Sequence, residues 1–104
     1  MAMTRDEYFL ICLAEECDEV GQRVMKALRF GLDEVQEGQA LSNKQRISEE
    51  LFDLVAVATL CDRMGLLAGV EPNEKAIQRK LAKIEKFMAI SREQGTLSEE
   101  ASNG

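Results

Sequence analysis

The chain has 104 residues and a formal net charge of −6 at pH 7; 45% of its residues are hydrophobic, only 5% are aromatic, and histidine and tryptophan are absent. This length allows one small domain, and the abundance of helix-forming residues favours an all-α fold over a sheet. The negative charge disfavours nucleic acids and anionic membranes as partners, and the lack of histidine excludes Ser-His and Cys-His catalysis and His-liganded zinc.

A first helix is predicted close to the N-terminus. Thr4 followed three residues later by Glu7 has the form of a capping box, which begins a helix. The helical pattern can continue to about Phe30, and Gly31 is a suitable stop. Residues 31–41 are predicted to form a connecting loop.

A second capping box, Ser42 followed by Gln45, predicts a helix that runs to about Met64. Residues 54–61 of this helix are apolar on nearly every side, and such a helix must be surrounded. We therefore expect an antiparallel helical bundle of three main helices that is completed by oligomerisation, as a homodimer or homotetramer.

After a connection over residues 65–72, Asn73 is predicted to cap a third helix that continues to about Arg92. Residues 95–104 are rich in Ser, Glu, Gly and Asn and predict a disordered tail. The helical domain is therefore expected to span residues 1–94.

A cytoplasmic location is expected. No apolar run is long enough to span a membrane, and the N-terminus lacks the pattern of a signal peptide. The three cysteines, Cys12, Cys17 and Cys61, lie among apolar helical residues and are interpreted as reduced thiols.

Two pairs of carboxylates carry the chemistry that the sequence suggests. Glu16 and Glu19 are spaced i, i+3 in the first helix, and Glu50 and Asp53 have the same spacing in the second. Residues at this spacing are neighbours on one helix face. Two such pairs brought together predict an all-oxygen site for a hard cation, Mg²⁺ with Mn²⁺ as a substitute.

The helical faces separate these acids from their neighbours in the first helix. Glu16 lies about 40° from the centre of the apolar stripe and Glu19 at its edge, whereas Glu15 and Asp18 lie about 140° or more away. The stripe consists of apolar residues at helical spacing: Phe9, Leu13, Val20, Val24 and Ala27.

In the second helix, Glu50 lies about 60° from the centre of the apolar stripe, whereas Glu49 projects to the opposite side. Asp53 lies further round, between Leu60 and Met64. The stripe itself is predicted at Ile47, Leu51, Leu54 and Ala58. Carboxylates at apolar positions are costly unless they are paired, protonated or bound to metal.

An ion pair is the competing explanation. Arg23 lies i+4 from Glu19 and could neutralise it without metal. One arginine cannot neutralise four acids, so the metal interpretation is favoured.

The pattern Glu-Glu-x-x-Glu followed by Glu-x-x-Asp on the next helix resembles the MazG family of all-α nucleoside triphosphate pyrophosphohydrolases, whose wider relatives include dimeric dUTPases and phosphoribosyl-ATP pyrophosphohydrolase. The core motif covers residues 13–53, with weaker similarity over 79–87. Residues 26–35 are similar to small stand-alone members that are often encoded by bacteriophages. The interval between the two motifs is slightly longer than usual in the family, and Ile84 stands where some relatives have asparagine. The base preference of relatives is therefore not transferred.

The resemblance implies metal-dependent hydrolysis of a nucleoside or deoxynucleoside triphosphate to the monophosphate and pyrophosphate. By position it implies metal ligation by Glu16, Glu19, Glu50 and Asp53, and a supporting or water-orienting role for Glu15.

Basic residues are expected to bind the phosphates. By the resemblance these include Lys80, with Lys83 and Arg79 as neighbouring candidates. From helical spacing, Lys26 lies about 20° from Glu19 on the same face, and Arg23 is near it. Lys26 is equally compatible with a solvated surface residue, and the basic stripe of the third helix is more often a solvated face than a binding surface. The remaining alternative for the whole chain is a non-catalytic helical interaction or nucleotide-binding module.

Overall fold

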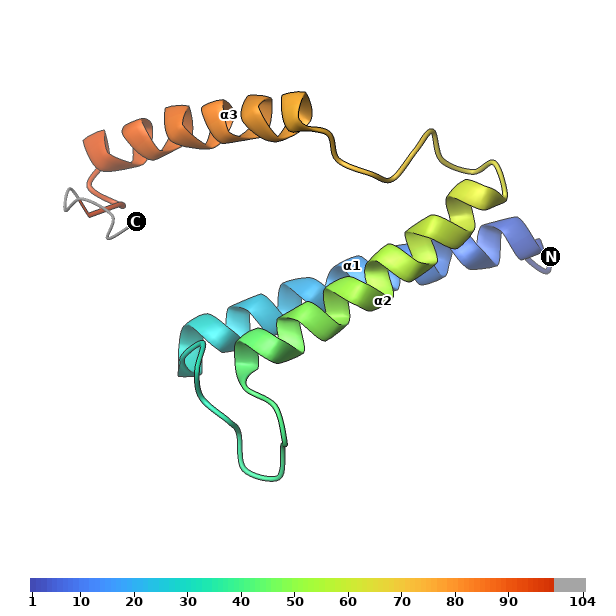
Figure 1. Cartoon of the computed structure of the whole chain (residues 1–104), viewed down its shortest axis with the longest axis horizontal. Helices are drawn as coiled ribbons and strands as arrows, with labels where there is room; N and C mark the ends of the chain where they lie inside the picture. Colours follow the sequence, from blue (N-terminus) through green and yellow to red (C-terminus); the bar gives the residue numbers. More distant parts are fainter. Residues whose placement is uncertain (99–104) are drawn as a thin grey trace. The chain divides into compact units, whose positions relative to one another are not determined.

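A computed structural model describes residues 1–98, which form three α-helices and no strand. The helices are α1 (Arg5–Phe30), α2 (Asn43–Arg63) and α3 (Glu74–Glu93) (Figure 1). The predicted all-α class and the number of helices are confirmed. Contacts between Cα atoms divide the chain into one unit that contains α1 and α2 (Met1–Val70) and a second that contains α3 (Glu71–Gly104). Each unit is described by itself.

The three predicted N-terminal caps are confirmed. Thr4 Oγ1 accepts a hydrogen bond from the Glu7 amide, and Glu7 Oε1 accepts one from the Thr4 amide, both at 3.1 Å. Ser42 and Gln45 form the same reciprocal box at the start of α2, at 3.3 and 2.9 Å. Asn73 Oδ1 accepts a hydrogen bond from a first-turn amide of α3. These bonds satisfy amides that a helix start leaves without an intrahelical partner.

The helix ends also follow the sequence closely. Gly31 has φ 106°, a conformation that side chains with a Cβ rarely adopt, and its amide donates to the carbonyl of Ala27. The last residue of α2 is Arg63, one position before the predicted end, and Met64 leads into Gly65 at φ 79°.

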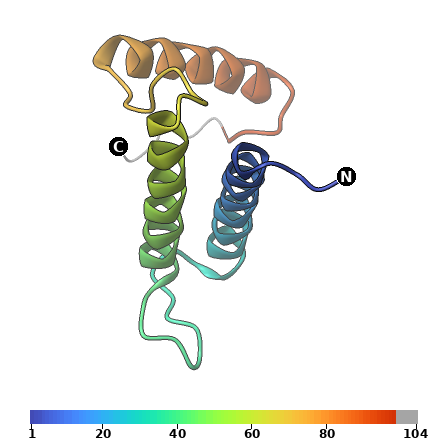
Figure 2. The same ribbon diagram turned by 90° about the vertical axis from the view of Figure 1, so that its right-hand side faces the viewer.

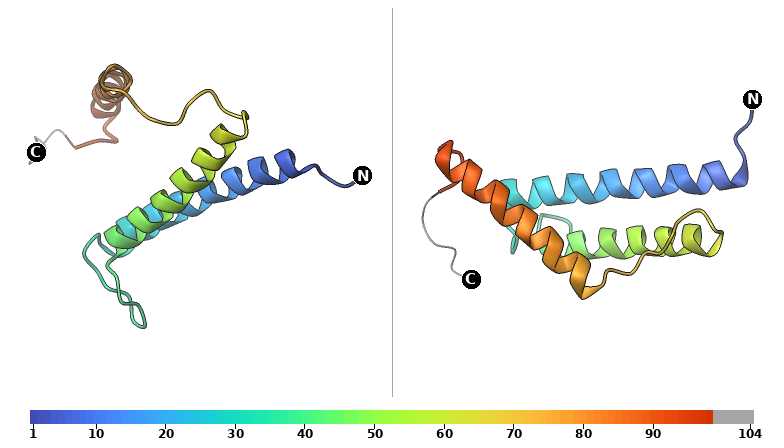
Figure 3. Two further views of the ribbon diagram at one scale, coloured as in Figure 1. Left: turned by 45° about the vertical axis from the view of Figure 1, so that its right-hand side comes forward. Right: turned by 90° about the horizontal axis from the view of Figure 1, so that it is seen from above.

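The first unit is an antiparallel hairpin in which α1 and α2 lie side by side (Figure 2; Figure 3). Among the described residues, Ala27 and Cys61 are the only fully buried hydrophobic side chains. Cys61 Sγ lies 3.6 Å from the carbonyl oxygen of Phe9, which ties the end of α2 to the start of α1. The two helices thus share a narrow seam rather than a deep core.

The seam positions recur at spacings of three and four along both helices, which is the period of helices packed lengthwise. In α1 they are the half-buried or buried residues Phe9, Leu13, Glu16, Val20, Arg23 and Ala27. In α2 they are Asn43, Ile47, Glu50, Leu54, Val57 and Cys61. Two predicted members of the apolar stripes lie elsewhere: Val24 and Leu51 are exposed, at 39% and 41%. The predicted centre of each apolar stripe is therefore rotated away from the contact between α1 and α2, because the prediction counted apolar residues that are in fact exposed.

The loop between α1 and α2 is anchored by Asn43, which is only 5% exposed. Its side-chain amide donates to the carbonyl of Gly31 at 2.8 Å and to Glu34 Oε1 at 3.1 Å. Its backbone amide donates to the Glu34 carbonyl, and the Lys44 amide donates to the Leu32 carbonyl, both at 2.9 Å. The predicted loop is therefore closed at its base by four hydrogen bonds.

The second unit consists of α3 and the turn that ends it. No residue of α3 is buried, and its apolar residues Ile77, Leu81 and Ile84 are 46–47% exposed. After α3, the Thr96 amide donates to the Ser91 carbonyl at 2.9 Å. Of the predicted disordered tail, residues 99–104 lie outside the described residues. Within residues 1–98, no helix has the length and apolarity needed to cross a membrane.

Candidate metal centre

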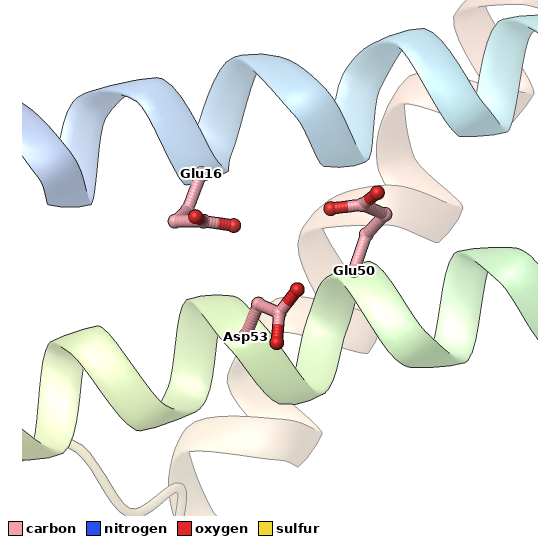
Figure 4. Close-up of side chains that lie close together, drawn as sticks. All are labelled: Glu16, Glu50 and Asp53. Carbon is pink, nitrogen blue, oxygen red and sulfur yellow. The ribbon is translucent and has the colours of Figure 1, made fainter.

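Three carboxylates from two helices meet at the middle of the hairpin. Glu16 projects from α1 toward α2, and Glu50 and Asp53 project from α2 toward α1 (Figure 4). One oxygen of each lies within 4.8 Å of the corresponding oxygens of the other two. Glu16 and Glu50 are half-buried because they occupy seam positions, while Asp53, one turn along α2 from Glu50, is exposed. Three of the four acids of the two predicted helical pairs are thus brought together, and Glu19 is not among them.

The cluster contains buried oxygens without partners. Oε2 of Glu16 and Oε2 of Glu50 are inaccessible to solvent and accept no hydrogen bond from any described residue. Buried carboxylate oxygens are normally satisfied by donors, and leaving them unmet costs free energy. A bound cation or proton removes that cost.

The electrostatics point the same way. Burial raises the pKa of Glu16 above its ordinary value, and the charges of Asp53, Glu50 and Glu15 raise it further. Loss of hydration disfavours the ionised form, and like charges add to that effect. The site therefore attracts positive charge.

Glu19, the fourth predicted ligand, borders the cluster rather than belonging to the set of three. It is exposed, and the close oxygens are those of Glu16, Glu50 and Asp53. A hydrogen bond with Glu50 is the main reason that its pKa is raised, followed by the charges of Glu16 and Glu50.

The cations predicted on α1 do not neutralise the cluster. Arg23 is half-buried and Lys26 is exposed. Within residues 1–98 neither forms an ion pair with a carboxylate, and the ion pair present there joins Lys44 to Asp33 at 2.8 Å. The Arg23–Glu19 ion pair, which was the competing explanation, is therefore absent from the described residues.

The acids assigned to solvent are indeed exposed: Glu15, Asp18 and Glu49. Glu15 nevertheless lies near enough for its charge to raise the pKa of both Glu16 and Glu19. It is the neighbouring carboxylate that the sequence proposed in a supporting role.

The basic residues predicted on α3 are all exposed and are described within the second unit. Arg79, Lys80 and Lys83 line a shallow groove of about 290 Å³ together with Ala76. Sequence reasoning missed a further groove of about 390 Å³, with Lys80 and Lys83 beside apolar and hydroxyl side chains: Ile84, Phe87, Met88, Ser91, Thr96 and Leu97. It depends on the turn that returns residues 96–97 to α3, which helical periodicity does not reveal.

The donor set fits a hard divalent cation. Carboxylate oxygens are the ligands that Mg²⁺ and Mn²⁺ prefer, whereas the absence of histidine and of thiolate among these ligands disfavours zinc and copper. Neighbouring oxygens around Mg²⁺ are separated by about 3 Å, so small rotations of the three side chains would complete such a site. Three protein oxygens leave several coordination positions open for water or phosphate.

Comparisons with protein-family models, curated proteins and solved structures gave no match to this chain. The site is therefore interpreted from its own residues.

Proposed function

We propose that the chain is a metal-dependent nucleoside triphosphate pyrophosphohydrolase, which converts a nucleoside or deoxynucleoside triphosphate into the monophosphate and pyrophosphate. The observation that supports this proposal is the cluster of Glu16, Glu50 and Asp53, in which two buried carboxylate oxygens have no partner. Such a site needs positive charge, and polyphosphate substrates arrive with divalent metal ions. The sequence resemblance described above supplies the class of reaction.

The roles follow from position. Glu16, Glu50 and Asp53 would hold Mg²⁺ or Mn²⁺, and Glu19, which is exposed, would contribute a further carboxylate to the metal. When bound, the metal lowers the pKa of water and neutralises phosphate charge. Water then adds to the α phosphorus, the bond from that phosphorus to the bridging oxygen breaks, and pyrophosphate leaves.

The carboxylates around the metal also handle the proton. Glu15 is exposed and close enough to influence Glu16 electrostatically, so it is suited to orient the attacking water and to receive its proton. Arg23 and Lys26 of α1, and Arg79, Lys80 and Lys83 of α3, are the candidates for binding the phosphates.

Oligomerisation is part of the proposal. A homodimer or homotetramer would complete the helical bundle, because the hairpin alone buries few hydrophobic side chains. The setting proposed for the reaction is the cytoplasm, that of the host if the chain is encoded by a bacteriophage.

A panel of common ribo- and deoxyribonucleoside triphosphates, each with Mg²⁺ or Mn²⁺, tests the function. Pyrophosphate and the monophosphate are measured separately, and a chelator serves as the control for metal dependence. Equal amounts of both products from at least one triphosphate support the proposal. Release of inorganic phosphate instead would indicate a different bond specificity. If folded protein that binds Mn²⁺ releases no product from any triphosphate, the enzymatic function is wrong. The alternative, a non-catalytic nucleotide-binding or interaction module, would then take its place.

A further inference from the structure

The larger groove on α3 has the size and the lining of a site for a small molecule. Its volume is about 390 Å³, and all of its lining residues belong to the second unit. Most of its surface is formed by apolar side chains: Ile84, Phe87, Met88 and Leu97. Binding sites for small molecules commonly have volumes of about 300–1,000 Å³ and are mostly apolar, with a few polar groups that fix the orientation of the ligand. The groove meets both conditions.

The groove exists because the chain turns back after α3. Gly95, with φ 78°, follows the end of the helix. The Ser91 carbonyl then accepts hydrogen bonds from the Thr96 amide at 2.9 Å, the Thr96 hydroxyl at 3.2 Å and the Leu97 amide at 3.3 Å. These bonds hold Leu97 beside the helix, where it is half-buried and forms one wall of the groove. The apolar surface of α3 is therefore hollowed at this place rather than flat.

One end of the groove is positively charged. Lys80 and Lys83 are spaced i, i+3 on α3, so they lie on one face of the helix. No acidic residue is among the described residues that line the groove, although the chain as a whole has a net charge of −6. Within residues 1–98 neither lysine forms an ion pair. The groove thus combines two unneutralised cations with an apolar body.

We propose that this groove binds a small amphipathic anion, namely an aromatic molecule that carries one carboxylate or phosphate group. Lys80 and Lys83 would pair with the anionic group, because they are the charged residues of the lining. The aromatic body would lie between Phe87 and Leu97, where its ring can contact the ring of Phe87 in an offset or edge-to-face arrangement.

The volume sets the size of the occupant. At about 30 Å³ for each water-sized group, 390 Å³ holds about 13 non-hydrogen atoms. That is the size of a two-ring aromatic acid.

This site goes beyond the proposed function. A nucleobase carries several hydrogen-bonding groups on its edge, and Ile84, Phe87 and Leu97 would leave those groups without partners. A hydrocarbon ring has no such groups to satisfy. The same two lysines are candidates for binding the triphosphate, so the experiments below contain neither nucleotide nor metal, which keeps the two roles separate.

The first experiment titrates 2-naphthoate, an aromatic carboxylate of this size, into the ¹⁵N-labelled full chain. A ligand of about 13 non-hydrogen atoms with the usual affinity per atom has a Kd on the order of 1 mM. Saturable shifts of backbone amide signals are expected within residues 80–97. The proposal is overturned if no saturable shift occurs at about ten times that concentration, or if the shifts are confined to the α1–α2 hairpin.

Related ligands test the two halves of the interaction. Naphthalene-2-methanol keeps the rings without the charge, and acetate keeps the charge without the rings. Each should bind at least about 5-fold more weakly than 2-naphthoate, and equal affinity of either would overturn the proposal. 2-Naphthyl phosphate separates the two anionic groups, since the tighter of the phosphate and the carboxylate identifies the group that the lysines select.

Variants locate the site. The double variant Lys80→Gln/Lys83→Gln should weaken binding of 2-naphthoate about 3- to 10-fold. Lys86→Gln is the matched control, because Lys86 is an exposed lysine of α3 that does not line the groove, and it should bind as the wild type does. Leu97→Ser removes a wall and should weaken binding about 10-fold.

Leu97→Ser leaves the sequence of α3 untouched, so it decides the matter if the double lysine variant loses helix content by circular dichroism. Wild-type affinity in a folded double lysine variant, or in Leu97→Ser, would overturn the proposal. The molecular mass is measured by light scattering over the same range of protein concentrations. Shifts of the groove signals that follow protein concentration and a rise in mass, without ligand, would assign the groove to a second copy of the chain and overturn the proposal as well.

Discussion

Glu16 of α1 and Glu50 of α2 face each other across the hairpin, and each holds one buried carboxylate oxygen that accepts no hydrogen bond from residues 1–98. Two like charges in this arrangement oppose the packing of the helices that carry them. A proton removes the repulsion between these two carboxylates at low pH, and a divalent cation is suited to remove it at neutral pH. Four predictions follow from this repulsion and from the loop that aligns the two helices.

Replacing Glu50 with glutamine removes one charge and one proposed metal ligand with almost no change of shape. Pyrophosphate release should fall at least about 100-fold, since loss even of groups that only support a ligand costs 10–100-fold. Stability without metal should stay the same or rise, because a repulsive buried charge is gone. Activity assays and urea unfolding measure the two effects.

Glu49→Gln is the matched control for this substitution. Glu49 is the preceding residue and is exposed, and its carboxylate is not among the three that meet in the cluster. It should keep wild-type turnover. Equal loss of activity in both variants would show that net charge, rather than ligation, governs the reaction.

Divalent cations should stabilise the folded chain. A ligand that binds only the folded state at 100 times its dissociation constant adds about 2.7 kcal/mol to the free energy of unfolding. For a domain of this size that corresponds to a rise in Tm of roughly 10 °C. Thermal unfolding with Mg²⁺, Mn²⁺ or chelator measures it. The shift should be lost in Asp53→Asn and kept in Asp18→Asn, and an unchanged Tm at saturating metal would count against the site.

Stability without metal should depend on pH in a particular direction. The folded pKa values of Glu16 and Glu19 are raised above the ordinary value of 4.5. The folded state therefore holds protons that the unfolded state has already released, and the free energy of unfolding should fall as pH rises above about 4.5. Urea unfolding from pH 4.5 to 7 in chelator measures the slope. Glu16→Gln should flatten it, and saturating Mg²⁺ should reverse it, whereas an identical slope in wild type and variant would refute the assignment.

Asn43 should be important for the alignment of the helices. Asn43→Ala removes two hydrogen bonds from a side chain that is 5% exposed, to Gly31 and to Glu34. The expected loss is about 1–3 kcal/mol of unfolding free energy. Gln36→Ala removes one exposed bond to Arg46 in the same loop and should cost less than about 0.5 kcal/mol. Equal losses of unfolding free energy in the two variants, measured by chemical denaturation, would show that Asn43 contributes no more than an exposed loop residue.

Local signals in the sequence were sufficient for much of the fold. Thr4, Ser42 and Asn73 cap their helices as predicted, because a cap depends on residues within one turn of itself. Glu16 and Glu50 were separated correctly from Glu15 and Glu49, because burial at helical spacing distinguishes adjacent residues by about 100°.

Features that depend on distant parts of the chain were not predictable in the same way. The side chain of Asn43 reaches back to Gly31, and residues 96–97 return to α3; neither contact follows from periodicity. The exposure of Val24 and Leu51 was missed for a related reason: an apolar residue contributes to a stripe whether it faces a partner helix or solvent.

The base of the loop between α1 and α2 has a consequence for how the chain can diversify. Its last backbone bonds join Leu32 to Lys44 and Glu34 to Asn43, and Gln36 is held to α2 by the bond from Arg46, so residues 37–41 extend beyond the closure. Closure entropy changes only slowly with loop length. A longer or shorter tip would therefore leave Glu16 opposite Glu50, and a peptide inserted after Glu37 would report on the tip without displacing either helix. The length and sequence of the tip can therefore change while the alignment of the two carboxylates is kept.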